Sequence, residues 1–96
     1  KNHIRRIAAI VAAVFECRLD SLFTRRVTKM ITPAKFAAYF IAATETEHSF
    51  PEIGRVYKKD PSTIMHGKKK CEERMEESQR YADRVQKAID EYRRIR

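Results

Sequence analysis

The chain has 96 residues, enough for one small domain with a single modest core, and its 21 Lys and Arg against 13 Asp and Glu give a formal net charge of +8. The excess lies before residue 72: residues 1–47 carry eight basic and four acidic side chains, residues 48–71 carry six and two, and residues 72–96 carry seven of each. This distribution favours a polyanion as the partner of the part before residue 72. The longest apolar run, Ile7 to Phe15, is too short to span a bilayer, so we expect no membrane segment.

A helix is predicted at the start of the chain. Apolar side chains recur there at spacings of three and four residues: Ile4, Ile7, Ala8, Val11, Val14 and Phe15. The stripe predicts a helix that buries one face and exposes Arg5, Arg6 and Ala13. An amphipathic helix on a membrane surface is the alternative, but Ala-rich stripes beside a basic loop are commoner in small cores.

A basic loop is predicted next. A short helical turn at Leu19 to Phe23 leads into the segment from Thr24 to Thr32, TRRVTKMIT, which has no helical periodicity. Its cations are Arg25, Arg26 and Lys29.

A third helix is predicted from Pro33 to about Glu47. Thr32 is suited to cap it, and Pro33 is suited to its first turn because the missing amide costs nothing there. The side chains expected to face inward are Phe36, Ala37, Phe40 and Ile41.

Two short helices joined by a tight turn are predicted between His48 and Gly67. Ser49 and Glu52 form a capping box that starts the first helix near Phe50. Asp60 is predicted to cap the second helix, with Pro61 at its first helical position. The short connection predicts a helix-turn-helix, the motif that places a recognition helix in the DNA major groove.

The second helix of this pair has one apolar side. Ile64, Gly67, Cys71 and Met75 recur at spacings of three or four. The other faces carry Ser62, Thr63, Met65, His66, Lys69 and Lys70. Gly67 costs about 1 kcal/mol relative to alanine in a helix, so its presence indicates close approach to a neighbouring helix.

The chain from Glu72 onward contains no Gly or Pro and is predicted to be helical, with a bend around Ser78. We therefore divide the chain into residues 1–77, the helix-turn-helix domain, and residues 78–96, a C-terminal helix. That helix either packs back on the domain or associates, through Tyr81, Val85, Ile89 and Tyr92, with a second copy to form a homodimer.

The segments SFPEIG and KDPSTIMHG resemble the C-terminal DNA-binding domain of the bacterial replication initiator DnaA, whose motif reads S-x-P-E-I-G followed by R-D-H-[ST]-T-V-x-H-A. The likeness extends upstream without gaps to about Val11, through LDSLFTRR and the helix from Ala34. It implies an all-helical domain of the Trp repressor type. It also implies binding of short double-stranded DNA boxes through the recognition helix and an arginine of the basic loop.

The resemblance also implies roles for single residues. The positions that read bases in the family correspond to Asp60, Pro61, Ser62 and Thr63, and the minor-groove arginine corresponds to Lys29. The expected phosphate contacts are Arg25, Arg26, Lys35, Lys58, Lys59 and Lys69. Pro61 replaces the family's histidine and Lys59 its arginine, so binding of DNA is better supported than binding of the family's own box.

The leading interpretation is therefore sequence-specific duplex DNA binding in replication initiation or transcriptional regulation, in the bacterial cytoplasm at the nucleoid. We expect a stand-alone or excised domain, of phage-derived or regulatory origin. A helical protein-interaction module that uses the C-terminal helix is the alternative. We expect no enzyme and no small-molecule substrate, because no carboxylate pair or nucleophile with a base can be placed. Cys17 and Cys71 lack metal-ligand spacing, and with only Gly54 and Gly67 there is no phosphate-binding glycine loop, so we expect no metal and no cofactor.

Overall fold

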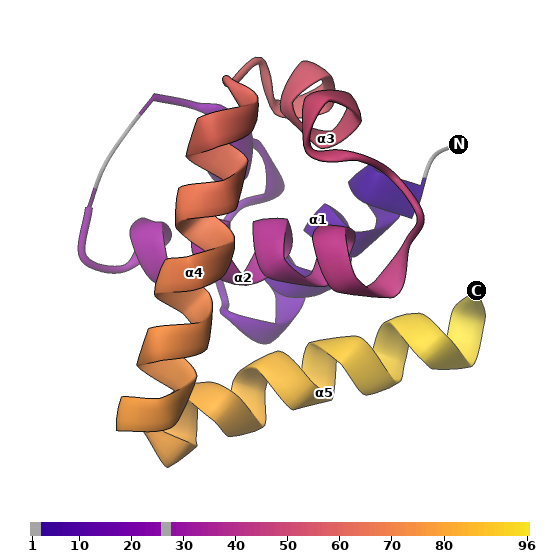
Figure 1. The fold of residues 1–96 in the computed structure, drawn as a ribbon. Helices are drawn as coiled ribbons and strands as arrows, with labels where there is room; N and C mark the ends of the chain where they lie inside the picture. The colour runs from indigo at the N-terminus through magenta and orange to yellow at the C-terminus, as the bar shows by residue number, and fades with distance from the viewer. Residues whose placement is uncertain (1–2, 26–27) are drawn as a thin grey trace.

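The computed structural model describes residues 3–25 and 28–96, and within these ranges the chain forms helices and no strand. The helices are α1 (His3–Val14), the 3-10 helix η1 (Leu19–Phe23), α2 (Ile31–Glu45), α3 (Phe50–Tyr57), α4 (Pro61–Glu77) and α5 (Gln79–Ile95). In Figure 1, α4 stands in front of α2, α3 lies near one end of α4, and α5 runs across the other end. The predicted all-α class is confirmed.

The core is built around α2, whose small side chains let other helices come close. Ala34, Ala37, Ala38 and Ala42 are fully buried on it, and α1 and α4 both pack against this helix. A Cβ added to Gly67 of α4 would lie 2.5 Å from a ring carbon of Tyr39. The close helix approach predicted from Gly67 is therefore confirmed.

The first helix buries the predicted stripe. Ile4, Ile7, Ala8 and Val11 are buried, whereas Arg5 and Arg6 on the opposite face are exposed. The stripe packs against α2 and α5, so α1 is a core helix of this domain. Within the described residues, no helix combines the length and the apolar character that crossing a membrane requires.

The third predicted helix, α2, begins and ends two residues earlier than its sequence indicated. The backbone amide of Ile31 donates to Thr28 Oγ1 at 3.1 Å, and the amide of Thr32 donates to the Thr28 carbonyl at 3.0 Å. The first turn is thus closed from Thr28, and Thr32 lies inside the helix. At the other end the backbone becomes extended at Thr46, whose hydroxyl donates to the Ala42 carbonyl at 2.6 Å.

The expected bend at Ser78 is a complete break between two helices. Ser78 has an extended backbone, and its Oγ accepts from the amide of Tyr81 at 3.1 Å, which caps α5. The Tyr81 hydroxyl donates to the Pro33 carbonyl at 2.6 Å and ties the start of α5 to α2. A bidentate ion pair between Arg93 and Glu45, at 2.8 and 2.9 Å, ties its end to α2 as well.

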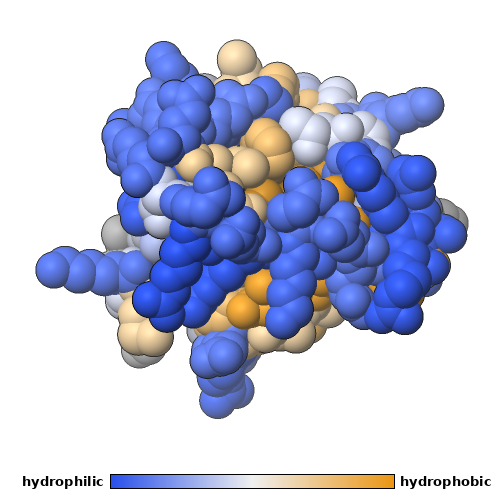
Figure 2. Space-filling model, turned by 90° about the horizontal axis from the view of Figure 1, so that it is seen from below, coloured by the Kyte–Doolittle hydropathy of each residue, from blue (hydrophilic) through white to orange (hydrophobic). Residues whose placement is uncertain are grey.

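The apolar stripe of α5 faces the domain. Tyr81, Val85, Ala88, Ile89 and Tyr92 are buried, and α5 packs against α1, α2 and α4. Figure 2 views the molecule from the side of α5, where hydrophilic side chains cover most of the face and apolar surface shows only in patches between them. The side chains that were considered for pairing with a second copy are therefore used inside this chain.

Candidate nucleic-acid interface

The first helix of the helix-turn-helix begins at the predicted capping box. Ser49 Oγ accepts from the Glu52 amide at 3.3 Å, and the Ser49 amide donates to Glu52 Oε1 at 2.8 Å. The hydrogen bond that the Ser49 amide donates to the Glu52 carboxylate is the main reason why the pKa of Glu52 is lowered. Both bonds confirm the capping box, and they start α3 at Phe50.

The turn between α3 and α4 is tight because Gly54 lacks a side chain. Lys58 takes the left-handed conformation, with φ 58° and ψ 47°, and ends α3. The Lys59 amide then donates to the Gly54 carbonyl at 2.8 Å. A Cβ at Gly54 would overlap the carbonyl oxygen of Lys59, so only glycine fits this position without a shift of the turn.

The second helix, α4, begins at Pro61 as predicted, but its cap differs from the prediction. The carbonyl of Asp60 accepts from the amides of Thr63 and Ile64 at 3.0 and 3.3 Å, and the Asp60 side chain makes no capping hydrogen bond. The backbone carbonyl satisfies the amide that the carboxylate was expected to cap. Asp60, Pro61, Ser62 and Thr63 are all exposed, so the first turn of α4 presents its polar side chains outward.

A basic pocket lies beside this first turn. Its volume is about 490 Å³, and its lining includes Arg25 from the basic loop, Arg55 from α3, Lys58, Lys59 and Asp60 from the turn, and Thr63 from α4. Arg25 is thus brought together with four other predicted site residues. The pocket contains four cations and one carboxylate, which suits an anionic ligand.

Arg55 is a site residue that the sequence analysis missed. It is exposed on α3, three and four residues before Lys58 and Lys59. Residues at these spacings lie near one another on a helix or its continuation, and that spacing was the available signal.

Lys35 is buried, and its ammonium group contacts the backbone at the start of the basic loop. It is only 7 % exposed, and its Nζ donates to the carbonyl oxygen of Thr24 at 2.6 Å. Burial lowers the pKa of Lys35, and the nearby charge of Lys59 adds to the effect. The phosphate contact of Lys35 stays a prediction, and in the structure its ammonium group supports the start of the basic loop.

Lys29 and Lys69 do not line the basic pocket. Lys29 is exposed and lies beside Arg74, and Lys69 is exposed on α4. Arg26 lies outside the described residues, so its predicted phosphate contact has no structural description.

Three aromatic rings connect the basic loop to the helix-turn-helix. The ring of Phe23, at the end of η1, stacks on Tyr57 of α3 with centroids 4.7 Å apart, and Tyr57 meets Tyr39 of α2 edge-on at 5.0 Å. Such pairs contribute about 0.5–1.5 kcal/mol beyond the area they bury. The stack fixes where the loop begins relative to α3 and α2.

This arrangement defines the class of protein. A small all-helical domain whose helix-turn-helix exposes the start of its second helix, with four cations beside it, is a helix-turn-helix DNA-binding domain. The family described as bacterial dnaA protein helix-turn-helix matches residues 4–71, and the chain belongs to this family. The helix-turn-helix fold and the double-stranded DNA partner of this family agree with the fold and the partner predicted from the sequence.

Individual proteins similar to this chain also belong to the DnaA family. The chain is similar to the chromosomal replication initiator protein DnaA of Cereibacter sphaeroides, at 34% identity over 87 residues, 90% of this chain and 19% of the relative. The DnaA of Desulfotalea psychrophila is 35% identical over 63 residues, 66% of this chain and 13% of the relative. The DnaA of Deinococcus radiodurans is 42% identical over 50 residues, which cover 52% of this chain and 10% of the relative. The chain thus spans 10 to 19% of the length of these relatives.

Proposed function

We propose that this domain binds a specific short sequence of duplex DNA and that it does so as part of chromosomal replication initiation. The supporting observation is the convergence of Arg25, Arg55, Lys58 and Lys59 beside the exposed first turn of α4. Replication is preferred to transcriptional regulation because the similar proteins are named as replication initiators.

In this proposal the first turn of α4 enters the major groove. The Thr63 and Ser62 hydroxyls can donate to or accept from base edges, and the Asp60 carboxylate can accept from the amino group of cytosine. Because the Asp60 side chain makes no capping bond, it can make such a contact without weakening its own helix. Pro61 offers no side-chain donor, so it contributes shape and apolar contact only.

The surrounding cations hold the phosphates. Arg25 and Arg55 carry planar guanidinium groups that can contact a phosphate through two hydrogen bonds, while Lys58, Lys59 and Lys69 act as compact charges. Arg26 is proposed as a further phosphate contact and Lys29 as the minor-groove contact. Lys35 acts through the carbonyl of Thr24, by holding the loop that carries these cations.

The proposed activity is binding and not catalysis, and it uses no metal and no cofactor. Within the described residues, no group of three or more His, Cys, Asp or Glu side chains is placed to hold a metal ion. One copy of the domain is proposed to be sufficient for binding, because the α5 stripe considered for a homodimer is buried. The proposed location is the nucleoid in the bacterial cytoplasm, where the DNA lies.

Selection of bound duplexes from a random pool, followed by titration of the selected duplex at several salt concentrations, tests this function. We expect one enriched short sequence. If Arg25, Arg55, Lys58, Lys59 and Lys69 all meet phosphates, the slope of log K against log salt should be about −4 to −5. A slope shallower than about −1, or a pool without enrichment, contradicts the proposal.

A further inference from the structure

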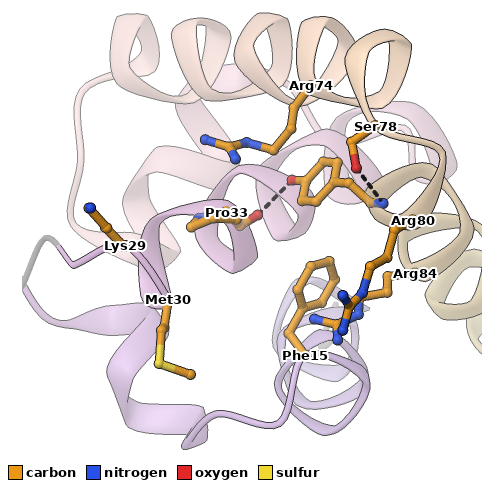
Figure 3. A pocket seen from close by; sticks show the side chains of 9 residues that line it. Phe15, Lys29, Met30, Pro33, Arg74, Ser78, Arg80 and Arg84 are labelled. Atoms are coloured by element: carbon orange, nitrogen blue, oxygen red, sulfur yellow. Dashed lines mark hydrogen bonds between the residues drawn. The ribbon is translucent and has the colours of Figure 1, made fainter.

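A second group of cations lies outside the basic pocket, where the end of α4 meets the start of α5. Arg74, Arg80 and Arg84, together with Lys29, surround a hollow of about 310 Å³ that also touches Phe15 and Tyr81. In Figure 3, Arg74 reaches in from α4, Arg80 and Arg84 lie together on a second side, and Lys29 lies on a third. Its nine lining residues contain four cations and no carboxylate.

Two arginines of this cluster, Arg74 and Arg84, lie against aromatic rings. The guanidinium carbon of Arg74 lies 5.6 Å from the centre of the Tyr81 ring, and that of Arg84 lies 5.8 Å from the centre of the Phe15 ring. A guanidinium over an aromatic face keeps its N–H donors directed outward along its edges. These two arginines are therefore oriented in advance for an anionic partner.

Residues 72–96 carry equal numbers of basic and acidic side chains, but only some of the basic side chains form ion pairs. Arg93 and Arg94 each pair with a glutamate, whereas within the described residues no carboxylate forms an ion pair with Arg74, Arg80 or Arg84. Three arginines without a paired acid repel one another on this surface. Binding of an anion relieves this repulsion, so the surface favours an anionic ligand.

The cluster continues the surface of the basic loop. Lys29 and Arg74 also line a neighbouring hollow of about 550 Å³ together with Thr28 and Thr32. Arg74 lies eleven residues after Thr63 on the same helix, which corresponds to about 16 Å along its axis. That length corresponds to about five nucleotide steps of a DNA strand.

We propose that Arg74, Arg80 and Arg84 bind backbone phosphates of the DNA that flanks the recognised sequence on the side of the basic loop. The footprint then extends about five base pairs beyond the bases that the start of α4 reads. This inference rests on the proposed function. It adds a contact surface formed by the end of α4 and the start of α5, a region with no net charge by count.

Arg80 is the best position for a test, because it is exposed and, among the described residues, no ring or carboxylate contacts its guanidinium group. The probes are the selected duplex with long flanks and two versions of it, each shortened by about five base pairs at one end. Arg80→Gln should bind the long duplex about two- to fivefold more weakly, with a salt slope smaller by about one. It should match the wild type on one of the shortened duplexes. Arg80→Lys, which keeps the charge, should retain most of the affinity.

Lys87→Gln is the matched control, since it removes one exposed charge from the same helix two turns further along, beside a different hollow. Equal affinities of Arg80→Gln and Lys87→Gln for the long duplex overturn the proposal, and so does an equal loss of Arg80→Gln on all three duplexes. Polyglutamate is titrated in parallel. Loss of polyglutamate binding without loss of DNA binding would assign the cluster to an acidic protein partner instead. A wild-type domain that binds no duplex overturns the proposed function itself, whereas an unchanged Arg80→Gln overturns only the flanking contact.

Discussion

The ammonium nitrogen of Lys35 lies 2.6 Å from the backbone carbonyl oxygen of Thr24, and this bond joins α2 to the residue at which the basic loop begins. Lys35 is almost fully buried, so its charge is directed at the backbone and not at solvent. A hydrogen bond from a charged donor is stronger than a neutral one, and its loss leaves a carbonyl without this donor. The position of the loop therefore depends on a residue that lies beneath it.

Lys35→Ala should lower both the stability of the domain and its affinity for every duplex. We expect a loss of about 1–3 kcal/mol in the free energy of unfolding, measured with urea, because a hydrogen bond from a charged group disappears. Lys69→Ala is the control, since Lys69 is exposed and should change affinity alone. If Lys35→Ala unfolds at the wild-type urea concentration yet binds DNA more weakly, Lys35 is a plain phosphate contact.

Thr63→Ala should affect base reading and not general affinity. Thr63 lines the basic pocket and is exposed on the first turn of α4. We expect a cost of about 1–3 kcal/mol on the selected sequence and relaxed preference at one base pair, with little change on random duplexes. An equal loss on selected and random duplexes, with the fold intact, would show that the first turn of α4 does not read bases.

Pro61→His should change the selected sequence while leaving the fold intact. Position 61 is the first residue of α4 and is exposed, so the new amide and imidazole meet no buried neighbour. The imidazole can donate to a base edge, and it restores the histidine of the family motif. Random-pool selection on both proteins checks this. Identical preferred sequences and equal affinities would place residue 61 away from the bases.

Glu45→Gln should destabilise the domain at neutral pH and not in acid. The hydrogen bond from Arg93 lowers the pKa of Glu45, so the ion pair stabilises the fold above the unfolded-state pKa. That contribution is lost as pH falls through the lowered pKa of the folded state. Because Arg93 is half exposed, we expect about 0.5–1 kcal/mol at pH 7. Thermal unfolding of both proteins at several pH values measures it, and a difference that persists at pH 2 rules out the ion pair as its cause.

Much of the fold could be predicted because its signals are local. The capping box at Ser49 and Glu52, the proline at position 61 and the apolar stripe of α1 depend on residues a few positions apart, and each is found as predicted. The start of α2 was misplaced because Thr28 and Thr32 both suit a cap, and only the three-dimensional path selects Thr28.

The candidate site could be predicted only in part, since it depends on contacts between distant segments. Nothing near Lys35 in the chain shows that its ammonium is buried against Thr24. Likewise, Arg55 joins Arg25 in one pocket only after the loop and α3 come together. The cluster of Arg74, Arg80 and Arg84 lies in a segment whose charges cancel by count, so charge counting could not show it.

The stack of Phe23, Tyr57 and Tyr39 has a consequence for the DNA sites that the domain can accept. Because it joins the start of the basic loop to α3 and α2, we expect the proposed groove contacts of the loop and of α4 to keep a constant separation. Inserting one base pair between those contacts rotates the second groove by about 34° relative to the first. We therefore expect the spacing within the site to be as strict as its sequence.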